Sequence, residues 1–147
     1  MIMDDCVFCK IANKEIPSHI VYEDEHLMAF LDLTQVTKGH TLLIPKKHIP
    51  DIFAYDDEDA QEIFKVLPRL ARALDKAFPD MKGLNILNNN REAAYQSVFH
   101  THIHLIPRYS RDDDDFKLHF PENVSEPDHE KMAQVKEQIA QAIKETK

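Results

Sequence analysis

Short apolar segments separated by turn-forming residues run through most of the chain, and each predicts a β-strand. Three of them lie at residues 20–23, 27–32 and 40–44, and two more lie at residues 84–87 and 98–106. Brief apolar runs bounded by Gly, Pro, Asp or Asn are typical of strands. Because helices are inserted between the strands without strict alternation, the pattern predicts an α+β fold with a five-stranded antiparallel sheet.

A short helix is predicted near each end of the chain. The N-terminal helix is capped by Asp4 or Asp5 and has ended by Pro17, while the C-terminal helix begins at Pro127-Asp128. The C-terminal helix carries an apolar stripe that predicts a packing seam: Met132, Val135, Ile139 and Ala142.

One long helix is predicted between the third and fourth strands. Asp56 or Asp57 caps its start. Pro68 falls inside it and predicts a kink or a local break. Apolar residues recur through it at helical spacing, so that one face is buried: Ile63, Val66, Leu67, Leu70 and Leu74.

Length and charge narrow the classes of function. The 147 residues predict a single domain, with a core over about residues 4–110 and an extension over about 111–147. A formal net charge of −8 argues against nucleic-acid binding, which needs many basic groups. The acidic run at 112–115 predicts a solvated loop, with a divalent-metal site as the alternative. Without a signal peptide or a membrane-length apolar stretch, we expect a cytoplasmic protein that contacts no membrane.

Three histidines within five positions are the most informative feature. On an extended strand, His100, His102 and His104 share one face at steps of about 6.6 Å, and the apolar residues between them point to the other. This arrangement predicts either a zinc site or a site for phosphate chemistry. Histidine attacks phosphorus directly, and neighbouring imidazoles with pKa values of about 6.5 donate protons to oxygen at neutral pH.

Cys6 and Cys9 form half of a four-ligand zinc site. The alternative is simple packing, because cysteines three apart also face the same way on a helix. A structural disulfide is not expected in a reducing compartment.

Several blocks together resemble the histidine triad (HIT) family. Residues 100–106 are similar to its His-x-His-x-His-apolar-apolar signature. Further family motifs match in order and spacing at residues 8–11, 15–17, 29–32 and 39–48. The likeness therefore runs from about Cys6 to Arg108. The branch most resembled is that of the bacterial zinc-containing HIT hydrolases, close to the nucleoside phosphoramidases. The resemblance implies a fold with a five-stranded antiparallel sheet, one long helix, a short N-terminal helix and a C-terminal helix.

The resemblance implies roles for four residues in catalysis. His102 is the nucleophile that attacks the α-phosphate of an AMP-like substrate, and water then hydrolyses the nucleotidyl-histidine. His104 and His40 belong to the phosphate site, and Ser97 donates a hydrogen bond to the scissile or leaving-group oxygen. Tyr95 stands where relatives often carry glycine, which bears on leaving-group specificity.

The resemblance also implies a nucleotide pocket and a metal site. Asp32 accepts hydrogen bonds from the ribose hydroxyls and Asn89 lies near the phosphate. The remaining nucleotide contacts are predicted at Phe8, Ile11, Phe30, Leu42, Gln96 and Val98, although each apolar one taken singly fits an ordinary core equally well. Structural zinc is implied at Cys6, Cys9, His48 and His100. His100 is then unavailable to phosphate, and the strand bends there.

The leading hypothesis is therefore a hydrolase of AMP conjugates, either phosphoramidates or dinucleoside polyphosphates, that binds a purine nucleotide and forms a homodimer as its relatives do. It uses no organic cofactor. Two alternatives remain open. One is a nucleotide-binding or protein-interaction module with little turnover, and the other is a catalytic zinc enzyme with all three histidines of the motif on the metal.

Overall fold

The computed structural model describes residues 5–111, 116–122 and 125–147. The chain divides into two compact units, residues 1–117 and residues 118–147. The described part of the first unit forms five strands and two α-helices, and that of the second forms the C-terminal helix. The α+β class is confirmed. The predicted acidic loop at 112–115 and the predicted cap at Asp4 lie outside the described residues.

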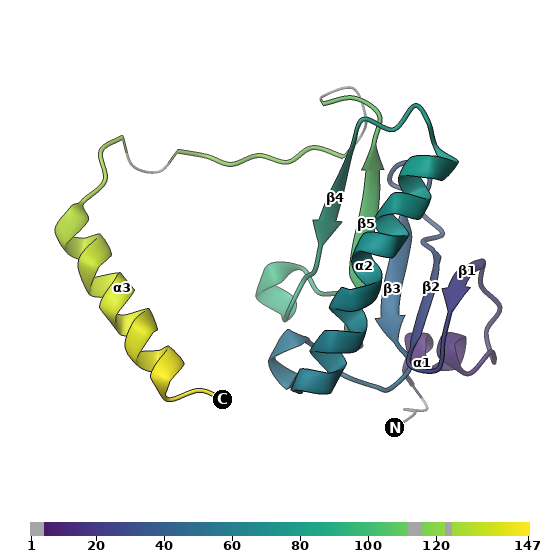
Figure 1. Cartoon of the computed structure of the whole chain (residues 1–147), viewed down its shortest axis with the longest axis horizontal. Helices are drawn as coiled ribbons and strands as arrows, with labels where there is room; N and C mark the ends of the chain where they lie inside the picture. The colour runs from purple at the N-terminus through teal and green to yellow at the C-terminus, as the bar shows by residue number, and fades with distance from the viewer. Residues whose placement is uncertain (1–4, 112–115, 123–124) are drawn as a thin grey trace. The chain divides into compact units, whose positions relative to one another are not determined.

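One antiparallel sheet forms the body of the first unit (Figure 1). Its strands run in the order β1-β2-β3-β5-β4, so the last strand inserts between β3 and β4. β1 and β4 are the edges. The bounds are β1 Ile20–Glu23, β2 Leu27–Leu31, β3 Thr41–Pro45, β4 Gly83–Leu87 and β5 Ile103–Arg108.

The two helices of this unit begin at side-chain caps. α1 (Val7–Ala12) is capped by Cys6, whose sulfur accepts from the Cys9 amide, and not by Asp5, one of the two predicted caps. α2 (Asp57–Ala77) starts at a capping box between Asp56 and Asp59. The predicted break at Pro68 is absent, since the helix continues through this exposed position.

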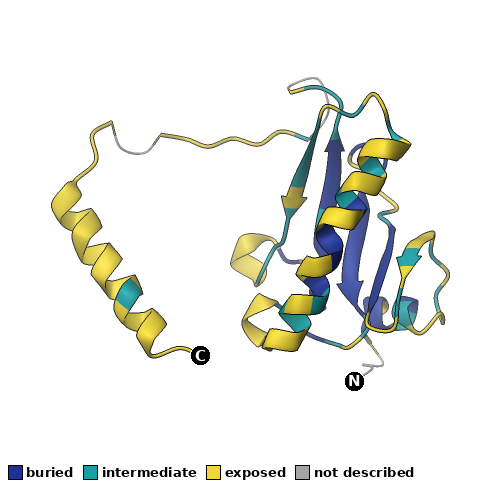
Figure 2. Cartoon of the chain, viewed as in Figure 1, coloured by how far each residue is buried: buried dark blue, intermediate teal, exposed yellow. Residues whose placement is uncertain are grey.

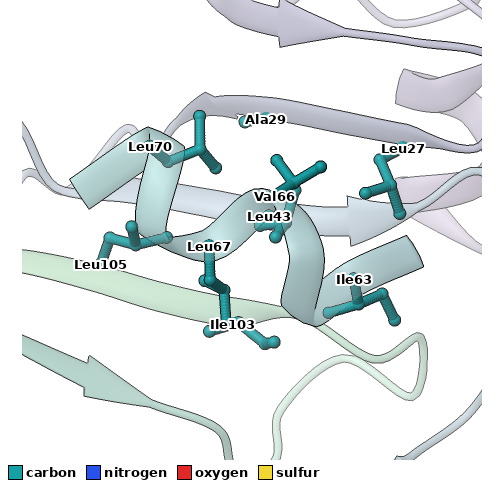
Figure 3. Packing of buried hydrophobic residues seen from close by; sticks show 9 residues of the cluster. All are labelled: Leu27, Ala29, Leu43, Ile63, Val66, Leu67, Leu70, Ile103 and Leu105. Carbon is teal, nitrogen blue, oxygen red and sulfur yellow. The ribbon is translucent and has the colours of Figure 1, made fainter. Parts of the chain in front are cut away.

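The main core lies between α2 and one face of the sheet (Figure 2). Alternate residues of β2, β3 and β5 point to this face, as the period of two along a strand requires. The helix contributes the apolar stripe predicted from the sequence. Figure 3 shows the packed side chains, which are Leu27, Ala29, Leu43, Ile63, Val66, Leu67, Leu70, Ile103 and Leu105.

A second core covers the opposite face of the sheet, under α1. Met28 and Phe30 of β2 and Leu42 and Ile44 of β3 pack there with the buried residues of the short helix. His104 lies directly opposite Leu42 in the β3–β5 register. The predicted site residues on β5 therefore belong to the face that α1 covers.

The second unit contains α3 (His129–Lys144), which begins at the Asp128 cap. Its predicted stripe is exposed in the structure, with Met132, Val135 and Ile139 all more than half accessible. Among the described residues, no helix has the length and apolar character needed to cross a bilayer.

Candidate active site and metal cluster

The chain bends at the histidine motif, so the three histidines do not share one face. β5 begins only at Ile103, whereas the sequence predicts a strand from Val98. The Thr101 amide donates to the Ile49 carbonyl at 2.7 Å, outside the ladder of β5. His100 turns away from His102 and His104 towards the two cysteines. The prediction of a common face is wrong for His100, and the three imidazoles do not converge on one metal.

A cavity of ≈310 Å³ opens on the α1 side of the sheet beside His102 and His104. Asp32 and Ser97 also line it, so it combines two imidazoles, a carboxylate and a hydroxyl. Its remaining wall is largely apolar and includes five of the predicted nucleotide contacts, Phe8, Ile11, Phe30, Leu42 and Val98. An apolar cleft with a few converging polar groups is the form that small-molecule sites take.

The hydrogen bond of His102 determines its tautomer. Its Nδ1 lies 2.8 Å from the backbone carbonyl of His100, and a carbonyl only accepts. Nδ1 therefore carries the proton, and Nε2 keeps its lone pair. Phe8 packs edge-on against the ring with centroids 5.0 Å apart, which restricts its rotation. The result is an oriented imidazole whose free nitrogen is an unprotonated nucleophile.

His40 and His104 form a chain of hydrogen bonds that ends at the cavity. The Val36 amide donates to His40 Nδ1 at 3.4 Å, so His40 carries its proton on Nε2. That Nε2 lies 2.8 Å from His104 Nδ1, which accepts. His104 consequently carries its proton on Nε2 and has a donor left for an oxygen of a bound anion. Of the described residues, His40 is not among those that line the cavity; it orients His104 from behind.

Burial keeps these imidazoles neutral. It lowers the pKa of His104 to about 4, helped by the nearby His102 and His40. The pKa of His102 is also lowered by burial, although the His100 carbonyl and Asp32 oppose this. The sequence-based expectation of pKa values near 6.5 is therefore wrong for these two rings. His104 therefore offers a neutral N–H donor to the cavity, and His102 Nε2 remains free of a proton.

Asp32 is held ionised at the rim of the cavity. Burial raises the pKa of the carboxyl group, but the hydroxyl and the amide of Thr34 both donate to it and lower the pKa. The net shift of the pKa is downward. One oxygen lies 3.9 Å from His40 Nε2. A fixed carboxylate beside a cavity is a good acceptor for paired hydroxyl groups.

Two predicted contacts, Asn89 and Gln96, do not line this cavity. Gln96 is buried and bonds backbone groups instead: its Nε2 donates to the Pro50 and Val98 carbonyls at 2.6 and 3.0 Å, and its Oε1 accepts from the Arg91 amide at 2.6 Å. It therefore shapes the loop that presents Ser97.

Asn88 and Ser18 were missed by sequence reasoning. Asn88 Nδ2 donates to the carbonyl of His102 at 2.8 Å and so holds the backbone of the central histidine. Asn88 directly follows the predicted strand at residues 84–87, and this position was the sequence feature that could have marked it as a site residue. Among the described residues, the hydroxyl of Ser18 is buried without a hydrogen-bond partner in the cavity wall. No sequence pattern marked it.

The second cluster brings together the four predicted metal ligands. His100 Nδ1 lies 3.3 Å from Cys6 Sγ and 3.4 Å from Cys9 Sγ, and His48 Nδ1 lies 3.3 Å from Cys9 Sγ. All four ligand atoms lie within 4.8 Å of one another. Tetrahedral zinc bonds place sulfur and nitrogen ligands about 3.5 Å apart, so this set fits zinc closely.

The surroundings of the cluster also suit a metal. His100 Nε2 donates to the Pro45 carbonyl at 2.8 Å, which leaves Nδ1 facing the sulfurs and orients the ring as outer-shell partners do. Burial raises the pKa of the Cys6 thiol to about 11, so a cation beside this sulfur would be needed to hold it as a thiolate. The four residues can bind a metal ion with every position filled by protein.

Comparison with known proteins identifies close relatives. Residues 13–111 match the model of the HIT domain. The chain is 50% identical over 132 residues to Protein hit of Bacillus subtilis, which covers 83% of this chain and 90% of that protein. The crystal structure of a HIT family member from the same organism superposes with a TM-score of 0.89 at 47% identity, covering 94% of this chain and 96% of the other.

Other relatives carry more specific descriptions. A zinc-bound histidine triad family protein from Mycobacterium smegmatis superposes with a TM-score of 0.71 at 36% identity, covering 88% of each chain. Adenosine 5'-monophosphoramidase HNT1 of Saccharomyces cerevisiae is 39% identical over 103 residues, 70% of this chain and 62% of that protein. Adenylylsulfatase HINT3 of Arabidopsis thaliana is 40% identical over 111 residues, 76% of this chain and 56% of that protein.

Proposed function

Because this chain belongs to the histidine triad family, we propose that it hydrolyses AMP conjugates at the α-phosphate through a nucleotide covalently bound to His102. The observation that carries the proposal is the hydrogen bond from His102 Nδ1 to the His100 carbonyl. It leaves the lone pair of Nε2 available in a cavity that also holds a neutral N–H donor on His104 and the Ser97 hydroxyl.

The reaction proceeds in two displacements. His102 Nε2 forms a bond to phosphorus while the bond from phosphorus to the leaving group breaks, and an amine leaving group departs with a proton drawn from solvent beside Ser97. Water then attacks the phosphorus of the nucleotidyl-histidine, which releases AMP, returns a proton to solvent and restores neutral His102. His104 donates to the phosphate oxygens during both steps.

The nucleoside binds along the apolar wall of the cavity. Asp32 accepts hydrogen bonds from the ribose hydroxyls, and the base lies against Phe8 and Phe30, whose rings pack edge to face with centroids 5.6 Å apart. The phosphoramidase and adenylylsulfatase descriptions of two relatives support adenylate conjugates as the substrate class. A purine nucleotide is the partner we propose.

Zinc is the metal we propose for the four-residue cluster. Cys6, Cys9, His48 and His100 would hold it, and its charge would neutralise the two thiolates and tie the N-terminus of α1 to the two histidines. It takes no part in the displacement, because no ligand position is left open. The zinc-bound relative supports this assignment.

A cytoplasmic homodimer is the state we propose for the protein. β4 is an edge strand, and Ile86 on it is 51% exposed. On α2, Phe64 is 49% exposed. These side chains suit an interface built from the long helix and the sheet edge. Light scattering after gel filtration should give twice the chain mass, and Ile86→Lys should give the monomer.

His102→Ala tests the covalent reaction. The variant should lose nearly all hydrolysis of adenosine 5'-phosphoramidate, by about 10⁴-fold or more, while its affinity for AMP stays within about threefold. Mass spectrometry of acid-quenched wild-type enzyme should find AMP attached to the peptide that contains His102. His26→Ala, at an exposed position that does not line the cavity, is the control. Unchanged turnover in the His102 variant would refute the mechanism, whereas negligible turnover by a wild-type protein that still binds AMP would favour the binding-module alternative.

A further inference from the structure

The peptide group between His100 and Thr101 is held on both of its sides. Its carbonyl accepts the proton of His102 Nδ1 at 2.8 Å, and its N–H donates to the Ile49 carbonyl at 2.7 Å. In a trans peptide the C=O and N–H bonds lie in one plane and point in nearly opposite directions. The bond to Ile49 therefore helps to aim the carbonyl at the His102 ring, and the two hydrogen bonds polarise the same peptide group.

Tyr55 holds the side chain of Thr101 from the other face of the sheet. Its phenol oxygen lies 2.7 Å from Thr101 Oγ1, which is the distance of a full hydrogen bond. The Tyr55 ring packs against the main core under α2, whereas the His102 ring contacts Phe8 on the α1 side. Tyr55 is not among the described residues that line the cavity, so any effect on the reaction passes through Thr101.

Residues 49–55, which connect β3 to α2, supply both contacts with Thr101. The segment contains one short 3₁₀ helix, η1 (Ile52–Ala54), whose first amides are capped by the Asp51 side chain. Tyr55 follows this helix directly, and its amide donates to the Ile52 carbonyl at 3.2 Å. The backbone of Tyr55 is thus fixed where its ring enters the core, so the hydroxyl is presented to Thr101 in one place.

The hydroxyl pair is buried and keeps its protons. Thr101 is only 1% exposed. Burial raises the pKa of the Tyr55 phenol more than its bond to Thr101 lowers it, so the phenol stays protonated at neutral pH. Each hydroxyl can both donate and accept, and the pair therefore shares one proton whichever group donates. Without the phenol hydroxyl, Thr101 Oγ1 loses a partner in a place that water does not reach, and the side chain moves to find another.

We propose that Tyr55 is a positioning residue, which acts through Thr101 to keep the His100 carbonyl aimed at His102 and so preserves the tautomer with a free Nε2. Its effect on turnover rests on the proposed function, whereas its effect on the imidazole does not. When the carbonyl tilts, its bond to Nδ1 weakens. A proton then leaves Nδ1 for solvent and another binds Nε2, because the partner of one ring nitrogen decides which of the two is protonated. A ring protonated at Nε2 has no lone pair in the cavity.

Tyr55→Phe removes the hydroxyl and keeps the ring. Nitrogen NMR of histidine-labelled protein at neutral pH distinguishes the tautomers, and the spectrum of His102→Ala assigns the signals. Wild-type His102 should show the Nδ1–H form, and in Tyr55→Phe the Nε2–H form should rise to about a fifth of the ring. Tyr22→Phe is the matched control, because Tyr22 packs against the same core and its hydroxyl bonds Asp24 at 2.6 Å. It should leave the His102 signals unchanged.

Substitutions at Thr101 test the partner of the bond. Thr101→Val should reproduce the tautomer change of Tyr55→Phe, and Thr101→Ser, which keeps the hydroxyl, should resemble wild type. The double variant Tyr55→Phe with Thr101→Val should differ from either single variant by less than about twofold in the tautomer ratio, since both changes remove one interaction. Additive changes would show that the two side chains act separately, and would overturn the proposal.

Turnover and bound metal complete the test. For adenosine 5'-phosphoramidate, kcat of Tyr55→Phe should fall by about five- to tenfold while KM stays within about twofold, because the attacking nitrogen changes and the binding wall does not. Zinc should remain at about one per chain, as in wild type. Unchanged His102 signals in Tyr55→Phe, equal changes in Tyr22→Phe, or zinc loss that accompanies the change would each overturn the positioning role. A tautomer change in a protein that cleaves no adenylate conjugate would instead overturn the proposed function and leave the positioning role standing.

Discussion

His102 and His100 are joined by one hydrogen bond, from the imidazole Nδ1 of the first to the backbone carbonyl of the second, at 2.8 Å. His100 in turn directs its own ring to Cys6 and Cys9. The proposed nucleophile is thus one hydrogen bond away from the proposed metal cluster. If both proposals hold, a change at the cysteines should alter the position of the His102 Nε2 lone pair.

Loss of the metal should reduce both stability and activity. In Cys9→Ser, bound zinc should fall from about one per chain to near zero, and the free energy of unfolding should fall by about 2–5 kcal/mol. Because His100 loses its anchor, kcat should fall by about 10–100-fold. Metal analysis, urea unfolding and turnover measure the three effects. Zinc added after chelation should restore wild-type enzyme but not the variant, and full activity in the zinc-free variant would disprove the coupling.

The free energy of unfolding should fall as the pH falls from 6.5 towards 4. In this range His104 takes up a proton in the unfolded chain but not in the folded one. Its folded pKa is about 4 and its ordinary value is 6.5, so the unfolded chain binds more protons between these limits. The contribution is complete above pH 6.5 and is lost as the pH falls towards 4. His40, whose pKa burial also lowers, adds to the loss. Together they should cost about 1–2 kcal/mol between pH 7 and 5.

Urea unfolding at several pH values measures this slope. His104→Asn keeps a polar group near His40 but removes a titrating imidazole, so its stability should vary less between pH 7 and 5. Carboxylates such as Asp32, with a pKa below 3.8, act only at lower pH and do not interfere. A variant slope equal to that of wild type would show that other groups cause the dependence.

Gly39→Ala should destabilise the protein by about 2–3 kcal/mol. Gly39 has φ +92°, and a Cβ there would lie 2.6 Å from the Phe78 ring. The residue precedes His40, so the strain should also weaken the contact with His104 and reduce turnover. Gly83→Ala is the matched control, because its Cβ would meet only Arg108 Cβ at 4.0 Å. Similar unfolding midpoints for the two variants would contradict the prediction.

Tyr95→Gly should stabilise the protein by about 0.5–1 kcal/mol. Tyr95 adopts φ 67° and is 88% exposed, so glycine removes the backbone strain and loses little packing. Tyr95→Ala keeps the Cβ and should show no such gain. Urea midpoints of the two variants separate the backbone effect from loss of the ring. A gain in the alanine variant would mean that the ring itself is unfavourable.

Much of the fold follows from local patterns in the sequence. Apolar runs place β1 correctly and the other strands of the first half within a residue or so, and the stripe from Ile63 to Leu70 predicts the face that α2 buries. These predictions succeed because alternation along a strand and the helical period depend only on neighbours in the chain. Of the two outcomes predicted at Pro68, a kink or a local break, the break is wrong, because α2 continues from Asp57 to Ala77.

The sequence by itself determined which chemical groups the site contains: the histidine motif, Asp32 and the Cys6–Cys9 pair. Only the tertiary structure decided their division into two clusters. An extended strand would keep His100 beside His102, but contacts with Cys6, Cys9 and the Pro45 carbonyl, all distant in the chain, turn it away before β5 begins. Local periodicity cannot encode such a bend, because the partners that stabilise it meet only when the sheet and α1 have assembled. The same holds for the hydrogen bond of Asn88 to the His102 backbone and for the low pKa of His104, which depends on burial.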